Sequence, residues 1–470
     1  MVEAPSLQST PQFMEELTTE VALLIESRKF IALRRRIEGL EPPDLAELIN
    51  RLGRDFEAVV FRLLPKELSV PTFEHLPVDT QEELLKALGD KAVAAILDDM
   101  SPDDRTGLLE ELPGKVTKRL INLLSPGERS VATKLLGYPE ESVGRLVTPD
   151  YVAVKPYWTV TEVLSHIRVF GRDSETLNVV YVVAKGGVLI DDIGLRDVLL
   201  AAPDTLVSDL MDRQYLSLTA TDDQELAVSV FRKFDRTVLP VVDTGGVLVG
   251  IVTVDDVLDI AEEEATEDIH KLGGSEALDE PYLTIALPKL IRKRLFWLVL
   301  LFFGQMLTAT AMGFFEDELA QALVLAIFVP LIISSGGNTG SQAATLIIRA
   351  MTLGEVGLRD WWRVMRREVL TGLIIGSILG TLGFLRIGAG EWLTGSYGQH
   401  WDVVGLTIGF SLLGIVLWGT LSGSLLPFAL KRLGIDPATS SAPLVSTLVD
   451  VTGLVIYFSV ASVVLRGTLL

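Results

Sequence analysis

A carboxylate lies inside an apolar stretch near the C-terminus. Residues 442–460 read APLVSTLVDVTGLVIYFSV, and Asp450 lies about two helical turns from the start of this stretch. A charged side chain at the centre of a bilayer costs roughly 2.5–3.5 kcal/mol on insertion scales. No basic residue is close to Asp450 in sequence. The pattern therefore predicts an intramembrane functional site, either a proton relay or a cation site.

Neighbouring oxygen atoms favour the cation site. Ser446 lies one turn before Asp450, and Thr452 and Gly453 follow it. Hydroxyl and carbonyl oxygens around one carboxylate suit a hard cation such as Mg²⁺ or Ca²⁺. A single acid per chain provides little negative charge for a divalent ion. We therefore expect a homodimer that brings two Asp450 side chains to one axial pore.

A second polar stretch, SSGGNTGSQ at 334–342, lies between the apolar runs LVLAIFVPLII and AATLII. Irregular backbone at membrane depth is tolerated only inside a protein or beside a water-filled cavity. Small residues also permit close contact between regular helices, which is the alternative. Since the amides of Asn338 and Gln342 need hydrogen-bond partners, we expect a broken helix that lines a cavity.

Five apolar segments are long enough to cross a bilayer as helices. They cover roughly 295–314, 319–350, 369–387, 403–430 and 443–465. Basic residues gather at 292–294, 359–367 and 431–432, whereas Arg386 and Arg466 lie at the opposite ends. The positive-inside rule therefore predicts a multi-pass protein of the cell (inner) membrane, with a cytoplasmic N-terminus and an external C-terminus.

The two parts of the chain differ sharply in charge. Residues 290–470 carry 10 acidic and 12 basic residues, whereas residues 1–289 carry the other 52 acidic and 29 basic ones. Such acidity argues against nucleic acid as a partner and favours small cations. The absence of cysteine excludes disulfides and thiolate metal sites. The first residues, MVEAPSLQSTPQF, lack the basic and apolar regions of a signal peptide.

An internal repeat occupies residues 139–265. VGRLVTPDYVAV at 143–154 matches VSDLMDRQYLSL at 207–218, and GGVLIDDIGLRDVL at 186–199 matches GGVLVGIVTVDDVL at 245–258. Short apolar runs and paired glycines predict strand, helix, strand, strand and helix in each copy. The repeat resembles a tandem pair of CBS domains, an α/β fold.

The second copy contains the stretch GIVTVDD. It resembles the part of nucleotide-binding CBS modules that places Thr253 and Asp256 against a ribose. The alternative, which we favour, is a strand that leads into a capped helix and needs no ligand. In the first copy Asp191 and Asp192 stand where Gly250 and Ile251 stand in the second.

Helical segments flank the repeat. Residues 14–138 contain short amphipathic helices that open at Pro77, Pro102 and Pro126, which predicts an all-α superhelical stack of helix pairs. Ser101 is expected to cap one of these helices. The predicted domains are 14–138 (acidic helical repeats), 139–200 (CBS 1), 201–265 (CBS 2), 266–294 (linker or plug helix) and 295–470 (five transmembrane helices).

This order of parts resembles the MgtE family of bacterial Mg²⁺ channels along nearly the whole chain. The motifs GGNTG at 336–340 and DVTG at 450–453 are specific in combination. The resemblance implies a dimeric Mg²⁺-selective channel that is gated by cytosolic Mg²⁺. It implies that Asp450 is the selectivity carboxylate, that Ser446 contributes a backbone carbonyl and that Asn338 lines the pore.

The resemblance also implies regulatory Mg²⁺ sites on the acidic cytosolic part. They would fall on Asp103, Asp223, Glu225, Asp235, Asp256, Asp259, Glu264, Glu267 and Asp268, with Asp436 at the membrane face. Pro71, Ser341 and Ala442 depart from residues that the family often has at these positions. The family includes ATP-binding members, so ATP at the CBS pair is a further implied ligand.

Two other functions fit the residues. One is a carrier that couples a divalent cation to H⁺ or Na⁺, because carriers also use broken helices and midplane carboxylates. The other is a nucleotide-responsive membrane sensor without transport. An enzyme is not expected, because the four histidines do not lie in a nucleophile–base pattern and the chain has no cysteine.

Overall fold

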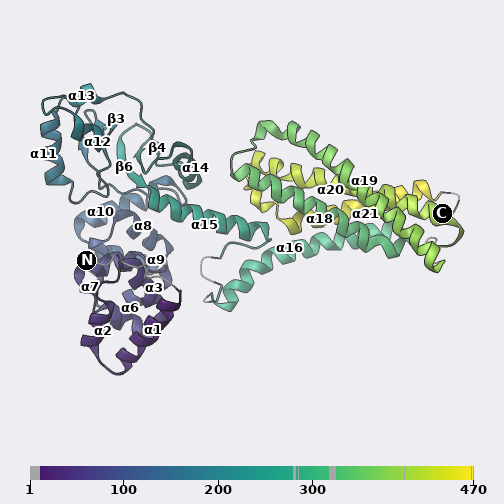
Figure 1. The fold of residues 1–470 in the computed structure, drawn as a ribbon, viewed down its shortest axis with the longest axis horizontal. Coiled ribbons are helices and arrows are strands. Elements are labelled where there is room, and N and C mark those ends of the chain that lie inside the picture. The colour runs from purple at the N-terminus through teal and green to yellow at the C-terminus, as the bar shows by residue number, and fades with distance from the viewer. Residues whose placement is uncertain are drawn as a thin grey trace, which may run out of the picture. The chain divides into compact units, whose positions relative to one another are not determined.

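The computed structural model describes residues 11–278, 282–283, 285–316, 324–395, 397–466 and 468. The chain divides into two compact units, residues 1–262 and 263–470 (Figure 1). Parts of two predicted elements lie outside the described residues: positions 319–323 of the second span, and positions 279–281 and 284 of the linker.

The first unit opens with a stack of short helices. They are α1 (Pro11–Glu26), α2 (Phe30–Ile37), α3 (Pro42–Leu52), α4 (Arg54–Phe61), α5 (Lys66–Glu74), α6 (Val78–Ala87), α7 (Asp90–Asp99), α8 (Pro102–Glu111), α9 (Gly114–Leu123) and α10 (Pro126–Leu135). One apolar core runs through them from Met14 to Ala132. Pro102 and Pro126 occupy the first helical position of α8 and α10, where a missing N–H costs nothing.

The stack repeats every 24 residues, and its hydrogen bonds show the repeat directly. The side chains at 81, 105 and 129 each donate to the carbonyl eight residues earlier, which belongs to Phe73, Leu97 or Ile121. In the same way, Glu74 accepts from the backbone N–H of Ser101, and Asp98 accepts from that of Ser125. The predicted side-chain cap at Ser101 is wrong, because its hydroxyl donates to Asp104 instead. The stacked helical repeats that the proline spacing predicts are therefore present.

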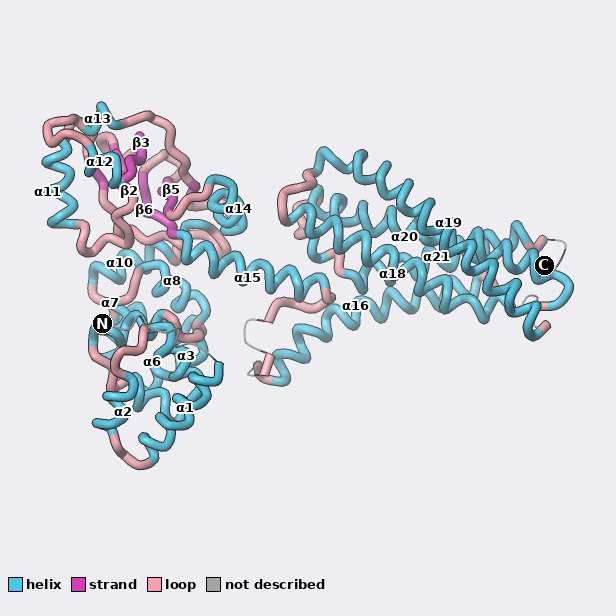
Figure 2. The backbone as a smooth tube through the Cα atoms, in the orientation of Figure 1, coloured by secondary structure: helices cyan, strands magenta, loops and turns pink. Residues whose placement is uncertain are grey.

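Two small sheets follow, and among the described residues strands occur only here (Figure 2). The elements are η1 (Val143–Arg145), β1 (Ala153–Val154), α11 (Val160–Phe170), β2 (Val179–Val183), β3 (Leu189–Gly194), α12 (Leu195–Leu200), α13 (Val207–Leu210), β4 (Leu218–Thr219), α14 (Gln224–Phe234), β5 (Val238–Val242), β6 (Leu248–Thr253) and α15 (Val254–Leu272). Each sheet has a parallel pair and then an antiparallel pair, β1-β2-β3 and β4-β5-β6. The predicted order of elements in both copies is confirmed.

The two sheets join through the turns that contain the paired glycines. The N–H of Leu189 donates to Gly246, and that of Leu248 donates to Gly187. Both glycines have positive φ, +83° at Gly187 and +77° at Gly246, so a side chain would strain either turn. Asp191 of the first copy is fully buried and accepts the N–H of Arg213, which gives this departure from the second copy a structural role.

Helix α15 runs without interruption through the boundary predicted between CBS 2 and the linker at 265/266. It ends before Gly273, and Gly274 has a φ of +73°, as expected for a helix stop. The next helix begins at Leu287, and Tyr282, Leu283 and Ile285 before it are not helical, although the sequence predicted a linker helix over 266–294. Local hydropathy does not mark either boundary, because both lie in mixed apolar and charged sequence.

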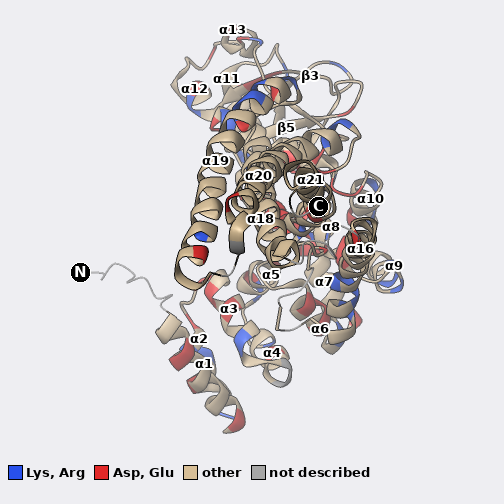
Figure 3. Cartoon of the chain, turned by 90° about the vertical axis from the view of Figure 1, so that its right-hand side faces the viewer, with Lys and Arg blue, Asp and Glu red and all other residues tan. Residues whose placement is uncertain are grey.

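Among its described residues, the second unit has five helices long and apolar enough to cross a membrane, as predicted. They are α16 (Leu287–Phe314), α18 (Val324–Thr352), α19 (Trp361–Thr394), α20 (Trp401–Arg432) and α21 (Ala442–Val464), with the short helices η2 (Leu358–Asp360), η3 (Gly398–His400) and η4 (Pro437–Thr439) between them. Positions of charged residues, blue and red in Figure 3, are frequent on the helices of the first unit and sparse along α18, α19 and α20.

The break predicted at SSGGNTGSQ is wrong, because α18 is a continuous helix through these residues. Its glycines are instead sites of close helix packing. A Cβ at Gly336 would collide with Ile415 of α20, and one at Gly340 would collide with Val445 of α21. The alternative interpretation, a small-residue contact between helices, is the one that the structure supports.

Changing Gly423 to alanine is expected to destabilise the helix bundle by about 1–3 kcal/mol, the usual cost of overpacking. A Cβ at this position of α20 would overlap the carbonyl oxygen of Gly340 on α18. The matched control is Gly313→Ala in α16, where a Cβ meets nothing within 4 Å. Thermal denaturation of the full chain in detergent would test this. Equal stability of the two variants would contradict the close packing of α18 and α20.

Candidate functional site

Asp450 lies on α21 and is 9% exposed within the chain. The Nε2 of Gln305 on α16 donates to its Oδ2 at 2.8 Å. Its Oδ1 faces α18, where a Cβ built on Gly337 would come within 3.5 Å. Among the ion pairs of the described residues none involves Asp450. The carboxylate thus stands between three helices with amide and glycine neighbours rather than an arginine.

Hydroxyl groups join α18 to α21 one turn away from Asp450. The hydroxyl oxygens of Ser341 and Ser446 lie 2.9 Å apart, and Ser341 donates to the carbonyl of Ala442 at 3.1 Å. Ser446 also lies 3.4 Å from the carbonyl oxygen of Gly337. The structure therefore brings Ser446 and Asp450 to the same face of α21, opposite the GGNTG segment.

Asn338, the third predicted pore residue, is exposed on α18. Its amide nitrogen donates to the hydroxyl of Ser334 at 3.3 Å on the same helix. Thr452 does not join the site, because its hydroxyl faces α20 and accepts from the indole of Trp418 at 2.7 Å. Gly453 also faces α20, beside Ile415. Two residues beyond Asp450 the helix has turned by about 200°, so these neighbours in sequence are not neighbours in the site.

A second group of functional candidates lies in the first unit, where the start of α8 approaches the start of α15. Asp103 is buried, and its Oδ1 has no hydrogen-bond partner among the described residues. Burial raises the pKa of Asp103 well above its usual range, and repulsion from Asp256 and Asp104 raises it further. Burial also raises the pKa of Asp256 to about 7. A buried, unpartnered carboxylate oxygen suits a cation that brings its own positive charge.

Other acids surround this pair, and of these the sequence singled out only Asp259. Burial raises the pKa of Glu74 to about 7, despite the N–H that it accepts from Ser101. Burial and the charges of Asp255 and Asp104 raise the pKa of Glu175. Burial and the charge of Asp255 also raise the pKa of Asp259, which is one of the predicted sensor residues. We call Asp103, Asp104, Glu175, Asp255, Asp256 and Asp259 the interdomain acidic cluster. Only residue spacing in three dimensions identifies it.

Thr253 and Asp256, the candidate nucleotide contacts, bond to each other. The Thr253 hydroxyl donates to the Asp256 Oδ2 at 2.6 Å, and α15 begins at the next residue. This is the capped helix start that we favoured. Asp256 thus belongs both to this cap and to the interdomain acidic cluster.

Three predicted sensor residues lie on α14 and are not brought together within one chain. Asp223 caps the start of the helix by accepting the N–H of Glu225 at 2.8 Å. Asp235 ends the helix in the left-handed region, with a φ of +49°. An 11-residue helix separates its ends by about 16 Å, so a single ion does not bridge them.

The remaining sensor candidates lie at the end of α15 and beside η4. Lys271 pairs with Glu267 one turn earlier and with Asp436 at 2.7 Å. Burial opposes the charge on Lys271, but its hydrogen bonds to Asp436 and Glu267 outweigh this and raise its pKa. Asp268 accepts from the hydroxyl of Thr352 at 3.3 Å. A lysine therefore already supplies positive charge at this group, and no pattern in the sequence indicates its contact with Asp436.

Comparisons with known proteins bear on both groups. The profile of the MgtE family, described as divalent cation transporters, matches residues 329–460. The MgtE intracellular N domain matches residues 40–141, and a CBS domain matches residues 207–263. The magnesium transporter MgtE of Thermus thermophilus is 41% identical over 444 residues, which cover 93% of this chain and 96% of that protein. The chain belongs to the MgtE family.

A further MgtE protein and a solved MgtE cytosolic domain are similar to this chain. The magnesium transporter MgtE of Bacillus subtilis is 30% identical over 437 residues, which cover 93% of this chain and 95% of that protein. A crystal structure of the cytosolic domain of the Mg²⁺ channel MgtE in complex with ATP is 37% identical, with a TM-score of 0.50. It covers 52% of this chain and 99% of that chain. The family predicted from GGNTG and DVTG is therefore confirmed.

In this MgtE chain the described acids do not form a complete metal-coordination site. Among the described residues, no three His, Asp or Glu side chains converge closely enough to hold a metal ion. The donor chemistry nevertheless suits hard cations, since carboxylate, hydroxyl and amide oxygens are their preferred ligands. Glu264, like Glu267 and Asp268, lies on the second half of α15.

Proposed function

We propose that this protein is a dimeric Mg²⁺ channel of the cell inner membrane. The observation that carries the proposal is Asp450, an intramembrane acid without an ion-pair partner among the described residues. The relatives of similar length are named as magnesium transporters, which supports Mg²⁺ as the transported ion. In the dimer, two Asp450 carboxylates and the neighbouring Ser446 and Asn338 oxygens line one axial path for a hydrated ion.

The proposed gate depends on cytosolic Mg²⁺. The buried, mutually repelling carboxylates of the interdomain acidic cluster make its closed arrangement costly without counter-ions. Mg²⁺ that binds between Asp103 and Asp256 offsets this cost, and a shift in equilibrium follows only from such a difference in affinity between two states. Several coupled sites make the response steep.

The other predicted sensor acids fit this gate as sites between two copies of the chain. Asp223 and Glu225 lie at the start of α14 and Asp235 lies past its end, too far away to share one ion with them in one chain. Glu264, Glu267, Asp268 and Asp436 surround the end of α15, where Lys271 now supplies positive charge. In the closed channel, Mg²⁺ adds to this charge and fixes the end of α15 beside the membrane helices.

Orientation follows from charge. The basic segments at 292–294, 359–367 and 431–432 place one end of the bundle in the cytoplasm. The N-terminal unit is then cytoplasmic and the C-terminus external.

ATP is a proposed ligand of the CBS pair. The support is the similar cytosolic domain that was solved in complex with ATP. Thr253 and Asp256 would exchange their mutual hydrogen bond for contacts to a ribose, since a hydroxyl and a carboxylate can both bind its hydroxyl groups.

Single-channel recording from the purified full chain in planar bilayers tests the function. We expect unitary Mg²⁺ currents whose open probability falls as Mg²⁺ on the cytoplasmic side rises. A carrier coupled to H⁺ or Na⁺ gives Mg²⁺ uptake without unitary currents. A nucleotide-responsive sensor gives neither, and each of these results would contradict the channel.

A further inference from the structure

Gln305 is the polar side chain of α16 that reaches the intramembrane acid. It lies within the run LFFGQMLTATAMGFF, and its Nε2 donates to the Asp450 Oδ2 at 2.8 Å across 145 positions of sequence. An amide donor stabilises negative charge on a carboxylate oxygen without adding a charge of its own. The hydrogen bond therefore occupies one of the two oxygens that the carboxylate offers to an ion.

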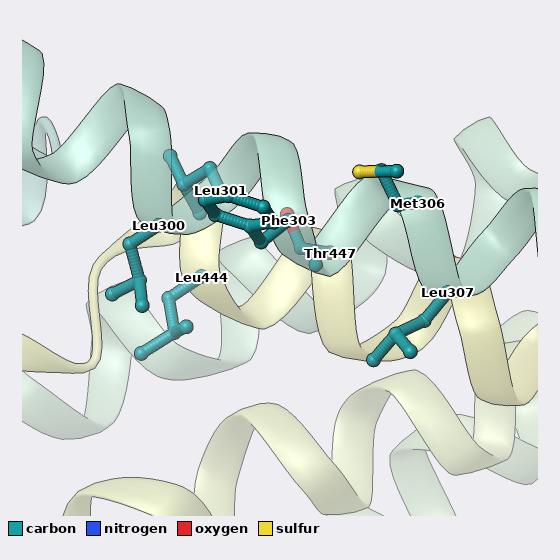
Figure 4. Close-up of a pocket in the computed structure, with 8 residues that line it drawn as sticks. Leu300, Leu301, Phe303, Met306, Leu307, Leu444 and Thr447 are labelled. Carbon is teal, nitrogen blue, oxygen red and sulfur yellow. The ribbon is translucent and has the colours of Figure 1, made fainter.

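Close packing holds this hydrogen bond in place. Gly304, next to Gln305, lies so close to α21 that a Cβ would come within 2.5 Å of Thr447. Thr447 lies one turn before Asp450 on α21. Figure 4 shows α16 and α21 side by side here, with Leu300, Phe303 and Thr447 between them. These residues line a groove with a volume of about 610 Å³. The backbone of α16 is thus fixed at the position where Gln305 meets the acid.

The second carboxylate oxygen lies toward α18. The Asp450 Oδ1 faces Gly337, where the missing side chain leaves room beside it. Ser446 borders the same space and lies 3.4 Å from the Gly337 carbonyl oxygen. The two oxygens of Asp450 therefore have different surroundings. One is bound by an amide, and the other borders the hydroxyl and carbonyl groups of α18 and α21.

We propose that Gln305 makes the site selective for Mg²⁺ over Ca²⁺ by limiting Asp450 to coordination through one oxygen. This inference rests on the proposed role of Asp450 in the pore. Mg²⁺ keeps most of its water, requires octahedral geometry and contacts a carboxylate through one oxygen. Ca²⁺ accepts six to eight ligands and often takes both oxygens of a carboxylate. When Gln305 binds one oxygen of the Asp450 carboxylate, the other oxygen can still coordinate Mg²⁺. Ca²⁺ then cannot bind both oxygens.

Gln305 is a positioning residue in this account, because it acts through Asp450. The variant Gln305→Met keeps a similar length and removes the N–H donor. It is expected to lower the Ca²⁺ concentration that halves Mg²⁺ flux by about tenfold, which equals about 1.4 kcal/mol of discrimination. Mg²⁺ flux without Ca²⁺ is measured for each variant, so that Ca²⁺ inhibition is compared with that variant's own uninhibited flux.

The assay measures Mg²⁺ uptake by proteoliposomes that contain the full chain, with added Ca²⁺ as the competitor. The matched control is Met306→Leu, a neighbouring exposed residue of the same helix. If Gln305→Met assembles poorly, Gln305→Ala also removes the donor and is expected to give the same shift in Ca²⁺ inhibition. The proposal is supported only if the Ca²⁺ concentration that halves Mg²⁺ flux falls. A purely structural role of Gln305 would lower the Mg²⁺ flux and leave this concentration unchanged.

Failure of this inference differs from failure of the proposed function. Flux that depends on Asp450 but shows unchanged Ca²⁺ inhibition in both Gln305 variants would overturn the selectivity role alone. A loss of Mg²⁺ flux in both variants, with an unchanged Ca²⁺ concentration for half inhibition, would also overturn it. An unmodified protein without Mg²⁺ flux would overturn the inference and the proposed function together.

Discussion

Replacing Asp450 with asparagine is expected to reduce Mg²⁺ flux by more than about 100-fold, which corresponds to about 2.7 kcal/mol. A divalent ion about 5 Å from a carboxylate gains about 6–7 kcal/mol of attraction at an effective dielectric constant of 20, before desolvation is subtracted. Asparagine keeps the size of the side chain and an oxygen that accepts from Gln305, but it has no charge. A loss of Mg²⁺ flux in this variant is therefore due to the missing charge and not to altered packing.

Uptake of Mg²⁺ by proteoliposomes measures this effect, and thermal denaturation in detergent checks that the variant folds. Asp402→Asn is the matched control, because Asp402 is an exposed acid in the first turn of α20. It is expected to change flux by less than about twofold. A folded Asp450→Asn protein with normal flux would remove the central residue of the proposed pore.

Much of the architecture could be predicted because it depends on patterns along the chain. Apolar segments of about 20 residues identified the five membrane helices, since a bilayer sets this length. The matching glycine turns at Gly187 and Gly246 identified the duplicated sheets, because both turns need positive φ. Each of these features is local, or repeats at a fixed distance, so one sequence is enough to reveal it.

The state of the SSGGNTGSQ segment could not be decided in this way. Small residues suit both a broken helix and a close helix contact, and the choice depends on the facing helix. Gly340 meets Gly419 and Gly423 of α20, about 80 residues later in the chain. With glycines on both sides the helices approach closely enough to remain regular, so the break is not needed.

The polar partners of the candidate sites were also missed, because they come from distant positions. Gln305 and Asp450 are 145 residues apart, and Lys271 and Asp436 are 165 apart. Glu175, on the loop before β2, joins acids of α8 and α15. A glutamine in an apolar run was the one signal in the sequence for the first of these. Nothing in the local pattern indicated the others.

Without Mg²⁺, the folded state of the first unit is expected to lose stability as pH rises from about 5.5 to about 7. Burial raises the pKa of Asp256 to about 7, whereas an unfolded aspartate titrates near 4. Between these values the folded form holds a proton that the unfolded form has released, so stability falls with rising pH and levels off above about 7. The free energy of unfolding falls by about 2 kcal/mol between about pH 5.5 and about pH 7. Glu74 adds to this fall, because burial raises its pKa to about 7 as well.

Mg²⁺ is expected to reverse this loss, most strongly at pH 8, where the carboxylates are ionised and protons no longer compete. A concentration 100 times the dissociation constant stabilises by about 2.7 kcal/mol. Hydrogen exchange of the α8 and α15 segments in the full chain, corrected for the intrinsic pH dependence of exchange, measures both effects.

The variant Asp256→Asn tests whether the charge of Asp256 causes both the loss of stability with rising pH and the stabilisation by Mg²⁺. Since it removes the group that titrates, it is expected to be more stable than the unmodified protein at pH 8 without Mg²⁺ and to respond less to added Mg²⁺. Asp209→Asn, at an exposed acid in the first turn of α13, is the control and is expected to change neither. If Asp256→Asn keeps the full Mg²⁺ response, then the interdomain acidic cluster is not the Mg²⁺ sensor.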